Sequence, residues 1–244
     1  MLTFVIVIPF IVGIPVSFLL NSNKDSPAYR LFAFALFLGI AIIILPLQTL
    51  VYLNIPIRQS YYLIWIITAL LWFWVYKKKI NKQIFKPYLP IIVVIIFVCL
   101  LHAVGLFIVG AKYYVGRAWN DAFNYTIIAQ YLARYAFDSS ITSLAHQPFA
   151  FSASYLVKDR IGQSIFQAFI MSATGLSAKT TYGPTIMLSI ALVAIVSYSL
   201  ARFHQFSKKT STVIAWLSAS LPSIALIHFD SFFSQALATP FLLV

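Results

Sequence analysis

This 244-residue sequence contains no glutamate, and its acidic residues are five aspartates. Lysine and arginine number 17, so the formal charge is +12, yet charged residues make up 9% of the chain. Soluble domains carry about 25% charged residues. Apolar residues make up 61% here, which is more than a soluble core of this size needs. The shortage of charge therefore excludes an ordinary soluble domain and indicates a surface that lipid solvates.

Cysteine is also scarce. The single one, Cys99, lies in an apolar run and has no partner for an intrachain disulfide. Histidine and cysteine show no pair at the spacing of known metal ligands, and the sequence has no glycine-rich phosphate loop. No motif for a structural metal or a bound nucleotide is therefore present.

The positive charge lies in short clusters between apolar runs, which excludes nucleic acid as a partner and favours anionic lipid head groups. The strongest cluster consists of Lys77, Lys78, Lys79, Lys82 and Lys86. Cytoplasmic loops of membrane proteins carry an excess of lysine and arginine, so we place this cluster in the cytoplasm. A second basic loop, at residues 202–209, gives the same orientation.

We predict an all-α transmembrane bundle of about seven segments, each of roughly 20 apolar residues. The segments are expected at residues 2–20, 31–52, 61–76, 88–110, 182–201, 212–227 and, incompletely, from 232. The first four form region 1–110, region 111–181 is an outer loop, and region 182–244 holds the last three. The residues after 232 are too few to cross a core about 30 Å thick, so we expect the chain to continue beyond Val244.

The outer loop has the periodicity of helices that lie along a membrane surface. Over residues 120–137, apolar residues recur on one face and Arg134 lies on the other. Over residues 160–173, a second apolar face lies opposite Gln163 and Gln167. We therefore expect two amphipathic juxtamembrane helices in this loop.

Four of the five aspartates lie on the predicted outer side, so acid–base chemistry is expected there. Asp121 stands at the head of the first amphipathic helix, where it or Asn120 would cap the helix and where a carboxylate can accept a proton from a hydroxyl. Asp230, beside His228 at the outer end of segment six, is the second candidate. The two aspartates would share a divalent cation, Mg or Mn, if they meet in space.

Residues 116–125, GRAWNDAFNY, place an aspartate just after an outward-going segment, and residues 160–175 supply a second helix before the chain returns. This arrangement resembles the first outer loop of GT-C class glycosyltransferases. Residues 229–240, FDSFFSQALATP, look like outer-edge motifs of bacterial members. The resemblance implies an enzyme of the bacterial inner membrane that moves a sugar from a polyprenyl-phosphate-linked donor to an acceptor on the extracytoplasmic face.

The resemblance implies that Asp121 is the catalytic base. It also implies that the protein binds membrane lipid and the lipid-linked sugar. No nucleotide is needed, because the lipid phosphate is the leaving group and basic side chains stabilise its charge. The residues expected to bind substrate are polar side chains of the outer loop and outer edge: Asn120, Asn124, Arg117, His146, Lys158, Arg160, His228, Asp230 and Gln235. Individual basic residues among them would otherwise serve as snorkelling anchors.

Other functions fit the same pattern. A lipid or solute transporter, or a flippase, would use several spans and proline-broken helices. An O-antigen polymerase or ligase would share the lipid-linked donor but depend on Arg117, Arg160 and His146. A structural assembly subunit also fits. The enzyme should have an outward cavity near Asp121, whereas a transporter should bind its cargo near the membrane midplane.

Overall fold

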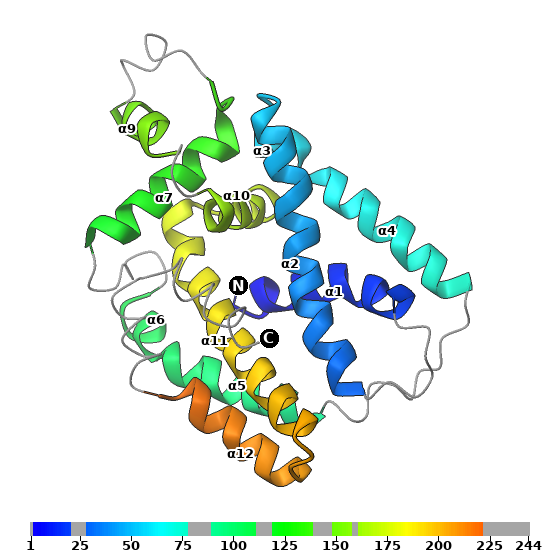
Figure 1. Cartoon of the computed structure of the whole chain (residues 1–244). Coiled ribbons are helices and arrows are strands. Elements are labelled where there is room, and N and C mark those ends of the chain that lie inside the picture. The colour runs from blue at the N-terminus through cyan, green and yellow to red at the C-terminus, as the bar shows by residue number, and fades with distance from the viewer. Residues whose placement is uncertain are drawn as a thin grey trace.

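The computed structural model is a bundle of helices (Figure 1) and describes residues 2–20, 28–77, 89–110, 119–138, 148–157 and 161–221. Every regular element within these ranges is a helix, which confirms the all-α prediction. The seventh predicted segment and the second half of the sixth, beyond residue 221, lie outside the described residues.

The first six predicted apolar segments overlap helices of the described chain. The fourth is divided between two helices, and the helix of the sixth begins at Lys208, four residues before the predicted start. The helices are α1 (Leu2–Leu20), α2 (Ala28–Tyr52), α4 (Tyr62–Lys77), α5 (Leu89–His102) with α6 (Val104–Val109), α11 (Ala178–Phe203) and α12 (Lys208–Ala219).

Three stretches of the described chain are long and apolar enough to cross a membrane: Phe34–Tyr52, Ile57–Lys77 and Ala178–Phe203. The first lies within α2, the second joins the short helix α3 (Ile57–Ser60) to α4, and the third is α11. The apolar parts of α1 and α5 are shorter. These helices indicate a membrane protein, but the predicted count of about seven spans is not confirmed.

Helix α11 occupies the centre of the bundle. Its side chains are buried on every face from Thr181 to Tyr198, because α1, α2, α5 and α12 pack against it. The buried hydroxyls of Thr181, Thr185 and Ser189 bond to carbonyls of the helix itself, as when Thr185 Oγ1 donates to the carbonyl of Thr181 at 2.6 Å. These three polar groups are therefore satisfied without water, as the inside of a membrane requires.

Helix α4 lies at the edge of the bundle (Figure 1). Ile66, Leu70 and Phe73 are exposed along its length, and Tyr62 and Tyr76 are exposed near its two ends. An apolar stripe between two aromatic ends is the pattern of a helix that faces lipid, with its aromatic residues at the two interfaces.

Helices α1 and α2 cross at a pair of glycines. A Cβ atom at Gly13 would lie 1.7 Å from the carbonyl oxygen of Ala35, and one at Gly39 would lie 1.8 Å from that of Pro9. Any larger residue would therefore push the two backbones apart. Small residues allow this close approach, and packing of this kind holds helices together inside a membrane.

A helical cap covers one end of the bundle (Figure 1). It consists of α3, α7 (Trp119–Arg134), α9 (Pro148–Leu156) and α10 (Gly162–Thr174). Helix α7 packs against α9, α10 and α3, and α10 also packs against α2 and α11. The two helices predicted for the outer loop are confirmed as α7 and α10.

The predicted surface position of α10 is wrong. Residues from Gln163 to Met171 are all buried, and Gln167 is fully buried although it was assigned to a polar, solvent-facing side. Gln167 Nε2 donates instead to the carbonyl of Ala178 at 2.8 Å and to Thr181 Oγ1 at 3.3 Å. Its polar side faces the first turn of α11 and not the membrane surface.

The capping assignment at α7 also needs correction. The helix begins at Trp119, so Asn120 and Asp121 lie inside its first turn and neither is the residue that precedes it. A carboxylate in the first turn still interacts favourably with the helix dipole.

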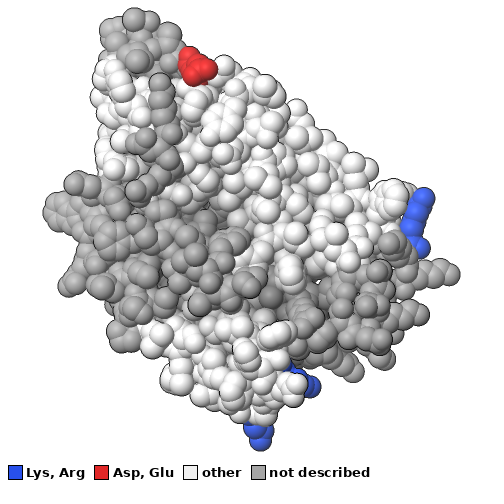
Figure 2. Space-filling view, viewed as in Figure 1, with Lys and Arg blue, Asp and Glu red and all other residues white. Residues whose placement is uncertain are grey.

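The ends of the long helices alternate as spanning helices require. α2 ends and α11 begins near the cap, and the other ends of α2, α4 and α11 point away from it (Figure 1). In Figure 2 the visible acidic atoms lie near the cap, and the visible basic atoms lie away from it. The assignment of the cap to the outer face stays a prediction.

Candidate functional site

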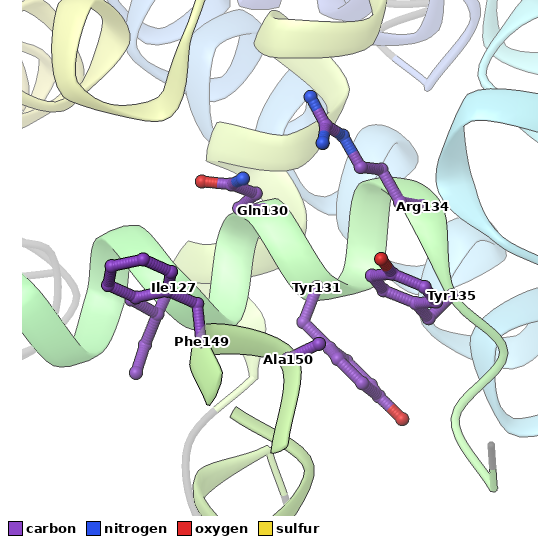
Figure 3. A pocket seen from close by; sticks show the side chains of 7 residues that line it. All are labelled: Ile127, Gln130, Tyr131, Arg134, Tyr135, Phe149 and Ala150. Carbon is purple, nitrogen blue, oxygen red and sulfur yellow. The ribbon is translucent and has the colours of Figure 1, made fainter. Parts of the chain in front are cut away.

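Two adjoining cavities open in the cap at the C-terminal end of α7. The first has a volume of about 230 Å³ and lies between α7 and the first turn of α9, lined by Ile127, Gln130, Tyr131, Arg134, Tyr135, Phe149 and Ala150 (Figure 3). The second has a volume of about 330 Å³ and lies between α7 and α3, lined by Pro56, Arg58, Gln59, Ala133, Arg134 and Tyr135. Arg134 and Tyr135 line both, so these two side chains are the centre of the site.

The end of α2 directs the chain into the second cavity. Asn54 adopts a left-handed backbone with φ of 62°, its N–H bonds to the carbonyl of Val51 at 2.9 Å, and the N–H of Ile55 bonds to that of Leu50 at 2.9 Å. This pair of bonds is a Schellman termination, in which asparagine tolerates the left-handed position better than most residues. Pro56 follows as the N-cap of the short α3, which begins at Ile57, and its extended backbone leads into the helix.

Helix α3 buries one side and leaves the other to the cavity. Ile57 and Ser60 are buried, and Arg58 and Gln59 between them are exposed. Four residues therefore suffice to anchor the turn and to present a guanidinium and an amide together.

The segment after α7 is fastened to the end of α2 by a contact that we term the Asn54–Asp138 clasp. Asn54 Oδ1 accepts from the backbone N–H of Asp138 at 2.9 Å, and Asn54 Nδ2 donates to Asp138 Oδ2 at 3.4 Å. Beside the clasp, the rings of Tyr52 and Phe137 pack edge to face with their centroids 5.2 Å apart. The clasp joins the two chain segments that carry Arg58 and Arg134.

Tyr131 holds the same turn from inside. Its ring is almost fully buried, and its hydroxyl donates to the carbonyls of Ala136 and Phe137 at 3.0 and 3.3 Å. It also packs against Tyr135 with ring centroids 5.4 Å apart. The floor of the first cavity is therefore rigid, while Gln130 and Arg134 project together from one side of α7 (Figure 3).

The site is electropositive. Arg58 and Arg134 are both exposed, and within the described part of the chain neither guanidinium has a salt bridge. Asp138, the one acidic side chain that the structure describes, is held in the clasp. Two cations from separate helices thus line one cavity, and the nearby Asp138 carboxylate accepts a hydrogen bond from the Asn54 amide.

No protein-family model, curated protein or solved structure matches this chain. The function therefore has to be inferred from the geometry of the cap and from the residues that the sequence places there.

Asp121 lies in α7 but at the other end from the cavities. Asn120 and Asp121 are in the first turn and Asn124, which is half-buried, is in the second. The side chains of the first two lie outside what the structure describes. Arg134 is thirteen positions further along the helix than Asp121, which at 1.5 Å per residue is roughly 20 Å.

The other predicted site residues lie outside the described residues: Arg117, His146, Lys158, Arg160, His228, Asp230 and Gln235. Their assignments stay predictions, as does the divalent cation between Asp121 and Asp230. Within the described ranges, no three histidine, cysteine or acidic residues gather as a metal site would require.

The sequence reasoning missed Arg58, Gln59 and the role of Arg134 at the end of α7. A signal for them was present, because the predicted alternation puts the short connection 53–60 on the same side as the loop 111–181. Polar residues in both connections were therefore candidates for one shared site.

Proposed function

We propose that this chain is a GT-C class membrane glycosyltransferase that moves a sugar from a polyprenyl-phosphate-linked donor to an acceptor on the extracytoplasmic face of a bacterial inner membrane. The observation that supports the proposal is the cap itself. Helices α9 and α10 each pack against α7 over one end of an apolar bundle, and Asp121 lies in the first turn of α7.

The cap suits a reaction between a lipid-linked donor and a water-soluble or membrane-bound acceptor. The acceptor oxygen would attack the anomeric carbon, and the bond from that carbon to the phosphate oxygen would break with its electron pair leaving on the phosphate. Asp121 would take the hydroxyl proton. Basic side chains of the outer loop, Arg117, Lys158 and Arg160, would stabilise the charge that develops on the leaving phosphate.

The position of the cavities does not separate the enzyme from a transporter. A transporter would bind its cargo near the membrane midplane and the enzyme would have a cavity near Asp121, whereas both cavities described above lie in the cap at the end of α7 away from Asp121. The polymerase or ligase alternative depends on Arg117, Arg160 and His146, and replacing each of these three separately would test it.

The proposal predicts that Asp121→Asn abolishes sugar transfer. Membranes containing the protein would be incubated with a panel of radiolabelled polyprenyl-phosphate hexoses and pentoses, and release of the lipid phosphate would be measured. Because general-base catalysis contributes about 10²- to 10⁴-fold, the variant should lose at least about 10²-fold in rate.

Asp25→Asn, the same substitution at the aspartate predicted to be cytoplasmic, is the matched control and should keep the wild-type rate. Expression and membrane insertion would be checked for both variants. A wild-type rate in Asp121→Asn would remove this residue from the chemistry and leave the proposal without its base.

A further inference from the structure

Arg58 and Arg134 come from parts of the chain far apart in sequence, yet both line the 330 Å³ cavity between α3 and α7. Each arginine alone has an ordinary explanation, because a positive charge in the last turn of a helix is stabilised by the helix dipole. That explanation does not account for two guanidinium groups in one cavity without a carboxylate bound to either among the described residues. Two guanidinium groups in one concave place, neither bound to a described carboxylate, suit an anionic ligand.

We propose that this cavity binds the phosphate group of an anionic membrane lipid. Guanidinium groups bind phosphate through two parallel N–H bonds, which lysine cannot reproduce. Gln59 and Tyr135 add an amide and a hydroxyl to the lining. The cavity is many times larger than the roughly 30 Å³ that a water molecule takes up, so a phosphate fits together with the ester groups attached to it.

The surroundings of the cavity favour a lipid over free phosphate. Tyr52, Leu53 and Tyr62, which flank α3 in sequence, are each more than half exposed. On the α9 side, Phe149 and Tyr155 are also exposed. Exposed aromatic residues gather at the level of the lipid head groups, so the two arginines lie at the depth where lipid phosphates are found.

This lipid is distinct from the donor in the proposed reaction. A base must lie within hydrogen-bond reach of the proton that it takes, whereas Arg134 is roughly 20 Å along α7 from Asp121. A phosphate held by Arg58 and Arg134 therefore does not belong to the bond that breaks. The inference holds whether or not the protein transfers a sugar. It goes beyond the proposed function because it gives the cap a second lipid site, separate from that of the donor.

The experiment is a binding measurement on the whole protein in neutral detergent. Phosphatidylglycerol would be titrated against wild type, Arg58→Gln, Arg134→Gln and the double variant, with bound lipid counted by native mass spectrometry and by the rise in melting temperature. Hydrogen bonds to charged groups are the stronger ones, but both arginines are exposed and water competes for them. We therefore expect each single variant to bind about tenfold more weakly and the double variant roughly a hundredfold more weakly.

Two controls remove the same charge elsewhere. The first is Lys179→Gln, in the first turn of α11 on the cap side of the bundle. The second is Lys209→Gln, in the first turn of α12 at the end of the bundle away from the cap. Both lysines are exposed, and both variants should bind lipid as wild type does. Arg58→Lys and Arg134→Lys keep the charge without the planar fork and should recover part of the affinity.

Three results would overturn the inference. The first is equal lipid binding in wild type and the double arginine variant. The second is an equal loss in Lys179→Gln, which would show general surface attraction. The third is displacement of the lipid by inorganic phosphate at millimolar concentrations, roughly the level of a weak free-anion site, which would make the ligand soluble phosphate. Because lipid binding is measured without any donor sugar, its failure is distinguishable from a failure of transfer.

Discussion

The glycine crossing of α1 and α2 gives the sharpest prediction for the fold. Replacing Gly13 by alanine would place a Cβ 1.7 Å from the carbonyl oxygen of Ala35, and replacing Gly39 would place one 1.8 Å from that of Pro9. Ordinary contacts of a Cβ lie at 3.4–4 Å. The obstructing atoms are backbone, so no side chain can rotate away, and the two helices must separate.

The expected cost follows from that separation. A gap of about 0.5–1 Å already loses a quarter to a half of the dispersion energy of each contact, and the separation required here is larger. Overpacking costs about 1–3 kcal/mol, and alanine returns up to about 1 kcal/mol through its better helix propensity. Because the obstructing atoms are backbone, we take the upper end of the overpacking cost, and after the gain in helix propensity each single variant should lose about 2 kcal/mol of unfolding free energy.

The assay is equilibrium unfolding in detergent, with Gly162→Ala as the matched control. Gly162 is the first residue of α10, and a Cβ there meets nothing within 4 Å, so this variant should be as stable as wild type or slightly more stable. Because Gly13 and Gly39 face each other, the double variant should cost less than the two single costs added together. Equal stability of Gly13→Ala, Gly39→Ala and Gly162→Ala would refute the close approach of the two backbones.

Two further predictions concern the cap. Asn54→Ala loses both hydrogen bonds of the Asn54–Asp138 clasp and puts alanine at a φ of 62°, so it should lower the unfolding free energy by about 2 kcal/mol. Asn54→Gly should recover the part of this cost that comes from the backbone. An alanine variant more stable than the glycine variant would contradict this. Gln163→Leu should leave stability unchanged or raise it, because its Nε2 is buried without a hydrogen-bond partner. Gln167→Leu loses the Nε2 bonds to Ala178 and Thr181 but also removes an Oε1 that is buried without a partner, so it should lose about 1 kcal/mol. The reverse order in thermal unfolding would show that the α10–α11 contact is described wrongly.

The apolar segments could be predicted from the sequence because a membrane helix carries its own signal in length and composition. α1 covers the same residues 2–20 as the first apolar run, and α7 begins at Trp119, one residue from its predicted start. Such boundaries depend on local chemistry alone. A count of spans depends also on how each helix lies in the bundle, which composition does not report.

The environment of α10 could not be predicted from its own periodicity. Gln163 and Gln167 share one face, and a polar face directed at water has the same spacing as one directed at another helix. The partner of Gln167, the first turn of α11, lies only a few residues further along the chain. The pattern therefore gave the helix correctly and its surroundings incorrectly.

The arginine cavity depends on contacts that no local pattern contains. Arg58 lies in a four-residue helix and Arg134 at the end of a sixteen-residue one, and they meet because the Asn54–Asp138 clasp joins their segments. Topology places both connections on one side of the membrane. It does not give the distance between them, which is set by the packing of α3 against α7.

The account rests on α11 crossing the membrane with the cap outside. Its 26 residues span roughly 39 Å, more than the ~30 Å of a bilayer core. Single cysteines would be introduced at Lys179 and at Lys209 in a Cys99→Ala background, and intact cells would be treated with a membrane-impermeant maleimide. The account predicts labelling of Lys179→Cys in intact cells and of Lys209→Cys only after the membrane is opened. Labelling of both from the same side, or the reverse pattern, would contradict it.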